Sequence, residues 1–231
     1  MDDQRRRRAD AGQVRATARD AVALSWVVEM YGMPLDLLRR LTGTSEGAMR
    51  QLLWRWRRAG WVESGQLGAG PSWVWATRLG IEQFGRHPYD PHRPSVAKVA
   101  HHRAVAAVRL EEESRRRDAG FAWESERELR YLLGQRRGSD AQREHLVDGI
   151  GEWDAPNGSR IRFGYEIELS PKPVGQLKNN ILAGLDMGGL VQVAWFVTDR
   201  TRALVERAVN EVSAGKRIVL RDVPEEGVLS G

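Results

Sequence analysis

The pattern of apolar and polar positions predicts three helices in the first third of the chain. Residues 18–31 carry apolar side chains at helical spacing. Pro34 then opens a second helix, because proline is well tolerated in a first helical turn. Thr44 or Ser45 caps a third helix, which ends at Gly60. The apolar positions of this helix follow the i, i+3, i+4, i+7 spacing of a buried face and are Met49, Leu52, Leu53 and Trp56.

A short β-hairpin and a further helix follow. Two apolar segments flank a glycine-rich tip between Gly65 and Pro71, and W-A-T-R-L-G begins a short helix. This element order, together with the phrase S-E-G-A-M-R-Q-L-L-W-R-W-R-R-A-G-W-V, resembles a winged helix-turn-helix domain. We therefore expect such a domain at residues 18–87, after a disordered basic arm at residues 1–17. An arm that contacts DNA phosphates is the alternative interpretation of that arginine-rich run.

The resemblance assigns the third helix to the major groove of double-stranded DNA and the hairpin to the DNA backbone. It makes these residues candidates for contact with bases or phosphates: Ser45, Glu46, Arg50, Gln51, Arg55, Arg57 and Arg58. The alternative is that the arginines only solvate a surface helix. Five tryptophans of this region are expected to pack in the core and in interfaces rather than to stack on bases: Trp54, Trp56, Trp61, Trp73 and Trp75.

The pattern changes after a segment with three prolines, residues 88–94, which is expected to be a linker. A long helix comes next, then a strand, or a strand with an extension, over residues 121–133. A hairpin and a helix–strand–helix–strand series follow. Strand–helix–strand crossovers predict parallel pairing. The expected fold class is therefore α/β (α+β), with a mixed sheet flanked by helices at residues 95–222 and a tail at residues 223–231.

The hairpin turns at Ala155–Ser159, and its second strand alternates strictly. One face carries the apolar side chains of Ile161, Phe163, Tyr165, Ile167 and Leu169. The other face carries Glu166 and Glu168, with Asp148 on the preceding strand. Three neighbouring carboxylates raise one another's pKa unless a cation lies among them. The hairpin is therefore either a metal site or a solvated acidic face.

Composition narrows the function classes. The 231 residues include no cysteine, which excludes disulfides and thiolate metal sites. The sequence has no apolar run long enough to predict a membrane-spanning helix. The arginines near the N-terminus are not followed by the apolar segment of a secretory signal. We therefore expect a cytoplasmic protein without a membrane partner. Before Val96 there are fifteen Arg or Lys residues against ten Asp or Glu, whereas the remainder has twenty-one of each. The whole surplus of +5 thus lies in the first part, which favours nucleic-acid binding there.

The second group of elements resembles the core of the PD-(D/E)XK nuclease-like fold: a helix, a three-stranded meander, a helix and a strand. In that family an Asp and a D/E-x-K pair bind a divalent metal and activate water. The resemblance implies that Asp148 and Glu166 would hold Mg²⁺ or Mn²⁺. Glu168 stands where lysine is usual, and Lys172 is displaced beyond Pro171. The implied catalytic group is Asp148, Glu166, Glu168 and Lys172, with Glu126 or Glu128 as an additional acid.

The alternative is a catalytically silent nuclease-like domain. His101 and His102, on the long helix, are expected to pack or to lie on the surface rather than to act in catalysis.

Residues from Ala18 to Leu220 also resemble the replication-relaxation family of actinobacterial mobile elements. The matching phrases are W-A-T-R-L-G, A-H-H-R-A-V-A-A-V-R-L, W-E-S-E-R-E-L-R, L-V-D-G and Y-E-I-E-L-S-P-K. The resemblance implies a DNA-binding protein of a plasmid or integrated element, acting in replication, relaxation or transfer with other proteins of those processes.

Three functions stay open at this point. The first is a Mg²⁺-dependent DNA endonuclease. The second is a non-catalytic DNA-binding regulator or relaxosome accessory, whose second domain serves homodimerisation or partner contact. The third is a repressor that senses a ligand in that domain.

Overall fold

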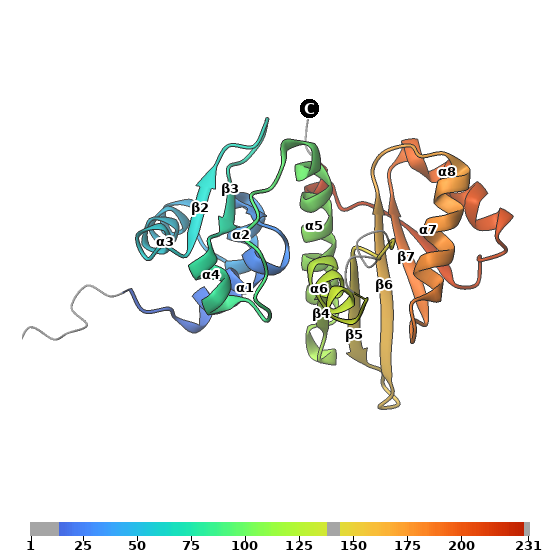
Figure 1. Cartoon of the computed structure of the whole chain (residues 1–231), viewed down its shortest axis with the longest axis horizontal. Coiled ribbons are helices and arrows are strands. Elements are labelled where there is room, and N and C mark those ends of the chain that lie inside the picture. Colours follow the sequence, from blue (N-terminus) through green and yellow to red (C-terminus); the bar gives the residue numbers. More distant parts are fainter. Residues whose placement is uncertain (1–13, 138–143, 229–231) are drawn as a thin grey trace, which may run out of the picture.

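Two β-sheets lie on opposite sides of a long central helix, α5 (Val99–Arg115) (Figure 1). The computed structural model describes residues 14–137 and 144–228. Within these ranges the chain is a mixed α+β structure with eight α-helices, one three-stranded sheet and one five-stranded sheet. No helix in the same ranges has both the length and the apolar composition needed to cross a bilayer.

The first sheet is antiparallel and has the strand order β1-β3-β2. Its elements and the helices around it are α1 (Ala18–Glu29), β1 (Met33–Pro34), α2 (Leu35–Thr42), α3 (Glu46–Arg58), β2 (Val62–Gly65), β3 (Trp73–Ala76) and α4 (Arg78–Phe84). Local capping explains the helix boundaries: Thr17 and Asp20 form a capping box at α1, and the Ser45 hydroxyl accepts a hydrogen bond from the backbone N–H of Ala48. Gly43, with φ of 62°, ends α2. The predicted helices and hairpin are therefore confirmed.

The strand β1 was not predicted. Pro34 does not lie inside the first turn of α2 but caps it, and it pairs with Trp73 in the sheet. A two-residue strand is too short to produce an alternating pattern in the sequence.

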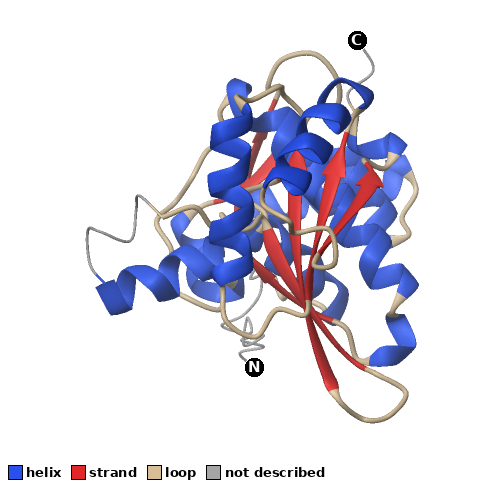
Figure 2. Cartoon of the chain, turned by 90° about the vertical axis from the view of Figure 1, so that its right-hand side faces the viewer, coloured by secondary structure: helices blue, strands red, loops and turns tan. Residues whose placement is uncertain are grey.

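The second sheet is mixed and has the strand order β4-β5-β6-β7-β8. Its strands are β4 (Ala122–Ser125), β5 (Gly149–Asp154), β6 (Arg160–Glu168), β7 (Gln192–Val197) and β8 (Ile218–Asp222). The first three strands are antiparallel, and β6, β7 and β8 are parallel, as the crossovers predict. Helices α7 (Val174–Asp186) and α8 (Asp199–Glu211) cover one face, and α5 covers the other (Figures 1 and 2).

The predicted alternation along β6 is confirmed. Phe163, Tyr165 and Ile167 are buried on the face toward α5. On the opposite face Trp195 of β7 packs against α7 and α8, and it pairs in register with Glu166. The two faces of the sheet thus belong to two separate hydrophobic clusters.

Of the strand expected within residues 121–133, only β4 (Ala122–Ser125) is extended, and α6 (Glu126–Arg137) follows it directly. The pair Ser125–Gly149 is the last rung of the β4–β5 ladder, after which the backbone N–H of Glu126 still donates to the carbonyl of Asp148 at 3.2 Å. The Ser125 hydroxyl accepts a hydrogen bond from the backbone N–H of Glu128 at 3.1 Å, as an N-cap does. Glu126 also pairs with Arg130 one turn later, which supports the helix.

The two halves of the chain share one core. A single cluster of buried residues extends from Val27 of α1 through Ala104 of α5 to Tyr165 of β6. The guanidinium of Arg109 lies 3.8 Å from the ring centroid of Trp26, and Arg103 pairs with Asp36 of α2 at 2.9 Å. The division at residues 88–94 stays a prediction, but the elements on its two sides are packed together.

Both ends of the chain extend beyond the described part. Most of the predicted basic arm, residues 1–13, lies outside the described residues, as do residues 229–231 of the predicted tail. Residues 223–228 of that tail pack near α5: Gly227 lies against Ala104, and Glu226 pairs with Arg40 of α2 at 2.6 Å.

Asp20 joins α1 to α3, and its replacement tests the packing of these helices. The carboxylate is fully buried, accepts a hydrogen bond from Trp56 Nε1 at 2.8 Å and pairs with Arg55. We expect Asp20→Ala to lower the free energy of unfolding by about 3 kcal/mol, because it leaves a buried donor and a cation without a partner. Denaturant titration measures this loss. Asp20→Asn can still accept the hydrogen bond from Trp56, so its free energy of unfolding should fall less. An equal fall in both variants would show that Asp20 stabilises the fold through its charge alone.

Candidate functional site

The outer side of α3 is a basic surface. Met49, Leu52 and Trp56 turn inward and are buried. The exposed residues on this side are Ser45, Glu46, Arg50, Gln51, Trp54, Arg57 and Arg58. All of them except Trp54 were assigned to DNA contact from the sequence, whereas Arg55, which was also assigned, is not among them. We call this set the α3 face. In the described parts of the chain, Arg57 and Gln51 form no hydrogen bond or ion pair, so both are available to a ligand.

Arg55 has a different place. It points toward α1 and forms an ion pair with the buried carboxylate of Asp20. Burial opposes ionisation of Asp20, but hydrogen bonds from Thr17 and Trp56, together with the charge of Arg55, hold the pKa of this carboxyl below its usual value. Arg55 therefore holds α3 to α1, and a substitution there would disturb the fold as well as any DNA contact.

Arg50 pairs with Glu46 one turn earlier, and the guanidinium lowers the pKa of that carboxyl. Both side chains are exposed, and such surface pairs contribute little to stability. Arg50 can therefore exchange this partner for a phosphate. A groove beside the α3 face is lined by Arg19 of α1, Gln51 and Trp54, so α1 adds another cation next to α3.

The acidic residues gather at the end of the β5–β6 ladder. Gly149 pairs with Tyr165, so Asp148, immediately before β5, faces Glu166 across the two strands. Glu168 follows two residues later on the same face. The exposed fractions of Glu166 and Glu168 are 4% and 2%. The alternative of a solvated acidic face is therefore wrong: these carboxylates are buried.

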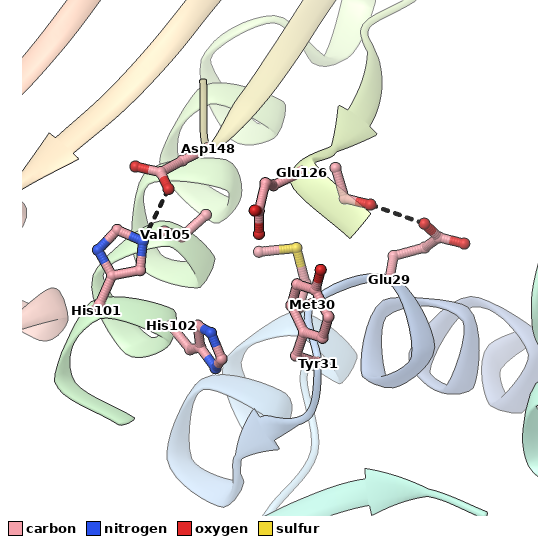
Figure 3. Close-up of a pocket in the computed structure, with 9 residues that line it drawn as sticks. Glu29, Met30, Tyr31, His101, His102, Val105, Glu126 and Asp148 are labelled. Carbon is pink, nitrogen blue, oxygen red and sulfur yellow. Dashed lines mark hydrogen bonds and ion pairs between the residues drawn. The ribbon is translucent and has the colours of Figure 1, made fainter. Parts of the chain in front are cut away.

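Asp148 is bound by two donors from different elements. Its Oδ1 lies 2.8 Å from Nε2 of His101 on α5, and its Oδ2 accepts the backbone N–H of Ile167 at 2.7 Å (Figure 3). Burial opposes ionisation, but His101 and this N–H lower the pKa of Asp148 below its usual value. The charge of Asp148 in turn raises the pKa of His101 to about 9. The pair is therefore a carboxylate and an imidazolium at neutral pH.

Glu166 has the opposite shift. Burial, followed by the negative charge of Asp148, raises its pKa to about 7. Nε2 of His145 lies 3.3 Å from Oε1 of Glu166, and this contact outweighs burial to raise the pKa of His145. Oε2 of Glu166 is buried and has no hydrogen-bond partner within the described residues. Glu166 can therefore take up or release a proton near neutral pH, and one of its oxygens is unused.

Of the other predicted site residues, Lys172 and Glu126 lie near these carboxylates and Glu128 does not. Lys172 reaches back to Glu168, with Nζ 2.6 Å from Oε2. Glu126 lines a cavity of about 20 Å³ together with Asp148 and His101 (Figure 3). This space suits about one water molecule. Glu128 lies elsewhere, 3.0 Å from Nη1 of Arg86.

The donor set at this site fits a divalent ion in part. Oε2 of Glu166 is an open oxygen donor, whereas both oxygens of Asp148 already have partners. Among the residues that the structure describes, no three His, Cys, Asp or Glu side chains are arranged to hold a metal ion. A Mg²⁺ ion here would therefore draw on Asp148 and Glu166 and take its other ligands from water or phosphate.

The chain matches no known protein-family model, and no curated protein is significantly similar to it in sequence. The assignment of function therefore depends on the geometry of the α3 face and of the acidic residues.

Sequence reasoning missed His101 and His145. It expected His101 to pack or to lie on the surface, whereas the structure brings it to Asp148. One signal was present: His145 stands three residues before Asp148 in the sequence. His101 lies 47 residues from Asp148, and no local pattern indicated their contact.

The pKa of Glu166 predicts a pH-dependent contribution to stability. Because its pKa rises from 4.5 to about 7 on folding, the folded chain holds a proton that the unfolded chain releases in this window. The stabilising contribution of Glu166 is thus fully present below pH 4.5 and is lost as the pH rises to 7. The difference in unfolding free energy between the wild type and Glu166→Gln should fall by on the order of 2 kcal/mol across this window.

Denaturant titration at several pH values measures that difference. Glu82→Gln, an exposed substitution on α4, is the matched control and should follow the wild-type profile. A constant difference between the wild type and Glu166→Gln would contradict the raised pKa.

Proposed function

We propose that this chain binds double-stranded DNA through the α3 face. The observation that carries the proposal is the position of Arg50, Arg57 and Arg58 on the exposed side of a helix whose other side is buried. Arginines in this arrangement neutralise phosphates and release counterions from the duplex. The arginine surplus before Val96 agrees with this role.

The order of the elements supports a winged helix-turn-helix domain. Helix α2 ends at Gly43 and α3 begins at Glu46, and the hairpin β2–β3 follows directly. In such domains the second helix of the pair enters the major groove. The four arginines Arg5–Arg8 precede α1 in the sequence, and Arg19 of α1 lines the groove beside α3.

The second half supports a PD-(D/E)XK nuclease-like fold. A helix, an antiparallel meander and a parallel crossover strand occur in the order α5, β4–β5–β6, α7 and β7, with α6 inserted between β4 and β5. Three phrases that resemble the replication-relaxation family lie on α5, on β4–α6 and at Asp148, and these segments line one cavity. We infer a role in the replication, relaxation or transfer of a mobile DNA element.

The facing carboxylates favour a second activity, divalent-metal-dependent cleavage of DNA. Asp148 and Glu166 lie opposite each other, and Glu166 has an unused buried oxygen. When bound, the ion would lower the pKa of a water and stabilise charge on the phosphate. The rival is a silent domain that serves partner contact, and it is favoured by His101 and Lys172, which already neutralise Asp148 and Glu168.

Arg57 and Arg58 provide the test of DNA binding. The double substitution Arg57→Ala and Arg58→Ala should weaken binding to a short random duplex and reduce the slope of log K against log salt by about 2, because two phosphate contacts are lost. Fluorescence anisotropy across a salt series measures both quantities.

The control removes the same charge at a distant place. Arg200 on α8 and Lys216 are exposed, and α8 lies at the opposite end of the molecule from α3 (Figure 1). Arg200→Ala with Lys216→Ala should keep the wild-type slope. If the two double variants lower the salt slope equally, DNA binding depends only on the overall charge of the protein and not on the α3 face. Arg55 is unsuitable for this test because it also holds Asp20.

The cleavage hypothesis is tested with supercoiled plasmid in Mg²⁺ or Mn²⁺. Nicked or linear product should form with the wild type and fall by about 10- to 100-fold in Asp148→Asn and Glu166→Gln, which is the typical cost of removing a group that supports a metal site. Absence of product with either ion, while duplex binding persists, would leave the silent domain as the function of the second half.

A further inference from the structure

Trp54 is the exception among the tryptophans of the first half. Trp56, Trp61, Trp73 and Trp75 are buried, as the sequence predicts. The exposed fraction of Trp54 is 62%, so this residue does not pack in the core of the chain. An exposed indole offers a large, flat apolar area to a ligand.

The surroundings of Trp54 select the ligand. Arg50, Arg57 and Arg58 lie one turn away on the same helix, and the Arg58 guanidinium is 5.3 Å from the ring centroid of Trp54. Arg19 lines the groove on the other side. An apolar centre within a ring of cations is complementary to DNA, which offers base edges between two rows of phosphates.

Gln51 lies three residues before Trp54, on the same exposed side. Its amide has no partner in the described chain and can bind N6 and N7 of adenine with two hydrogen bonds. The main apolar feature in the major groove is the methyl group of thymine. Indole carbon atoms can pack on that methyl, whereas indole has one donor and no acceptor for the polar edges.

The spacing on α3 matches neighbouring base pairs. Three residues along a helix correspond to about 4.5 Å. Successive base pairs are about 3.4 Å apart along the duplex. Gln51 and Trp54 can therefore address the same or adjacent base pairs.

We propose that Gln51 and Trp54 form the sequence-reading part of the α3 face: Gln51 binds an adenine, and Trp54 packs against a thymine methyl of the same or the adjacent base pair. This inference rests on the proposed DNA-binding function and adds its specificity. The arginines around the pair bind phosphates and supply affinity without sequence preference.

The test begins with selection from a library of randomised duplexes, using the whole chain. The wild type should enrich an adenine and a thymine in the same or adjacent base pairs. Replacing that thymine by deoxyuridine removes one methyl group and should weaken binding by about three- to fivefold. Replacing the adenine by 7-deazaadenine removes N7 and should weaken it by a similar or larger factor.

The variants assign each effect to one side chain. Trp54→Ala should bind the thymine and deoxyuridine duplexes equally, and Gln51→Ala should lose only its sensitivity to 7-deazaadenine. Leu79→Ala, another exposed apolar truncation in the same half, should behave as the wild type. Thermal unfolding checks that each variant is folded, which is expected because both side chains are exposed.

The outcomes separate the inference from the function on which it rests. If the wild type binds no duplex at low salt, the proposed DNA binding itself fails. If it binds but shows no thymine preference, or if Trp54→Ala keeps that preference, the assignment of Trp54 is overturned while DNA binding stands. If Trp54→Ala weakens binding only to single-stranded DNA, the assignment is overturned in favour of base stacking. If the wild type is a dimer and Trp54→Ala is a monomer, it is overturned in favour of a protein partner.

Discussion

Helix α5 must be covered on all sides, and the arrangement of the chain follows from this constraint. Every residue from His102 to Leu110 is buried, so the burial extends around the whole helix. A helix buried on every side must be packed against other elements all round. The five-stranded sheet covers one side, and α1, α2 and β1 cover the other. Neither half can leave α5 without exposing this surface, so both halves keep a fixed relation.

That constraint links the two candidate sites. His101 and Arg103 are two residues apart on α5, yet His101 contacts Asp148 in the acidic group, whereas Arg103 contacts Asp36 of α2. Further contacts cross the same boundary, since the hydroxyl of Ser125 donates to Glu29 of α1 at 2.9 Å. A rigid connection of this kind would hold DNA bound on the α3 face at a constant distance from the acidic residues, and a flexible linker would not.

The parts of the fold that depend on local pattern could be predicted from the sequence. The alternation of β6 and the apolar spacing of α3 identified both elements, because burial of one face imposes a period. The misses have a common cause in tertiary contacts. The Ser125 hydroxyl, which caps α6, donates to Glu29 of α1, Arg55 turns inward to the buried Asp20, and His101 reaches a carboxylate 47 residues away. No periodicity in the sequence predicts these tertiary contacts.

The charges of the acidic site also bear on its chemistry. Each of its three carboxylates has a cation or an imidazole from outside the strand pair: His101 for Asp148, His145 for Glu166 and Lys172 for Glu168. These partners leave the site nearly neutral when no metal is bound. Its stability does not require an ion, and the fold can persist whether or not the site is active. Oε2 of Glu166 is open to an ion, whereas both oxygens of Asp148 are engaged by His101 and by the backbone N–H of Ile167. An ion that binds both carboxylates must therefore displace one of the two donors of Asp148.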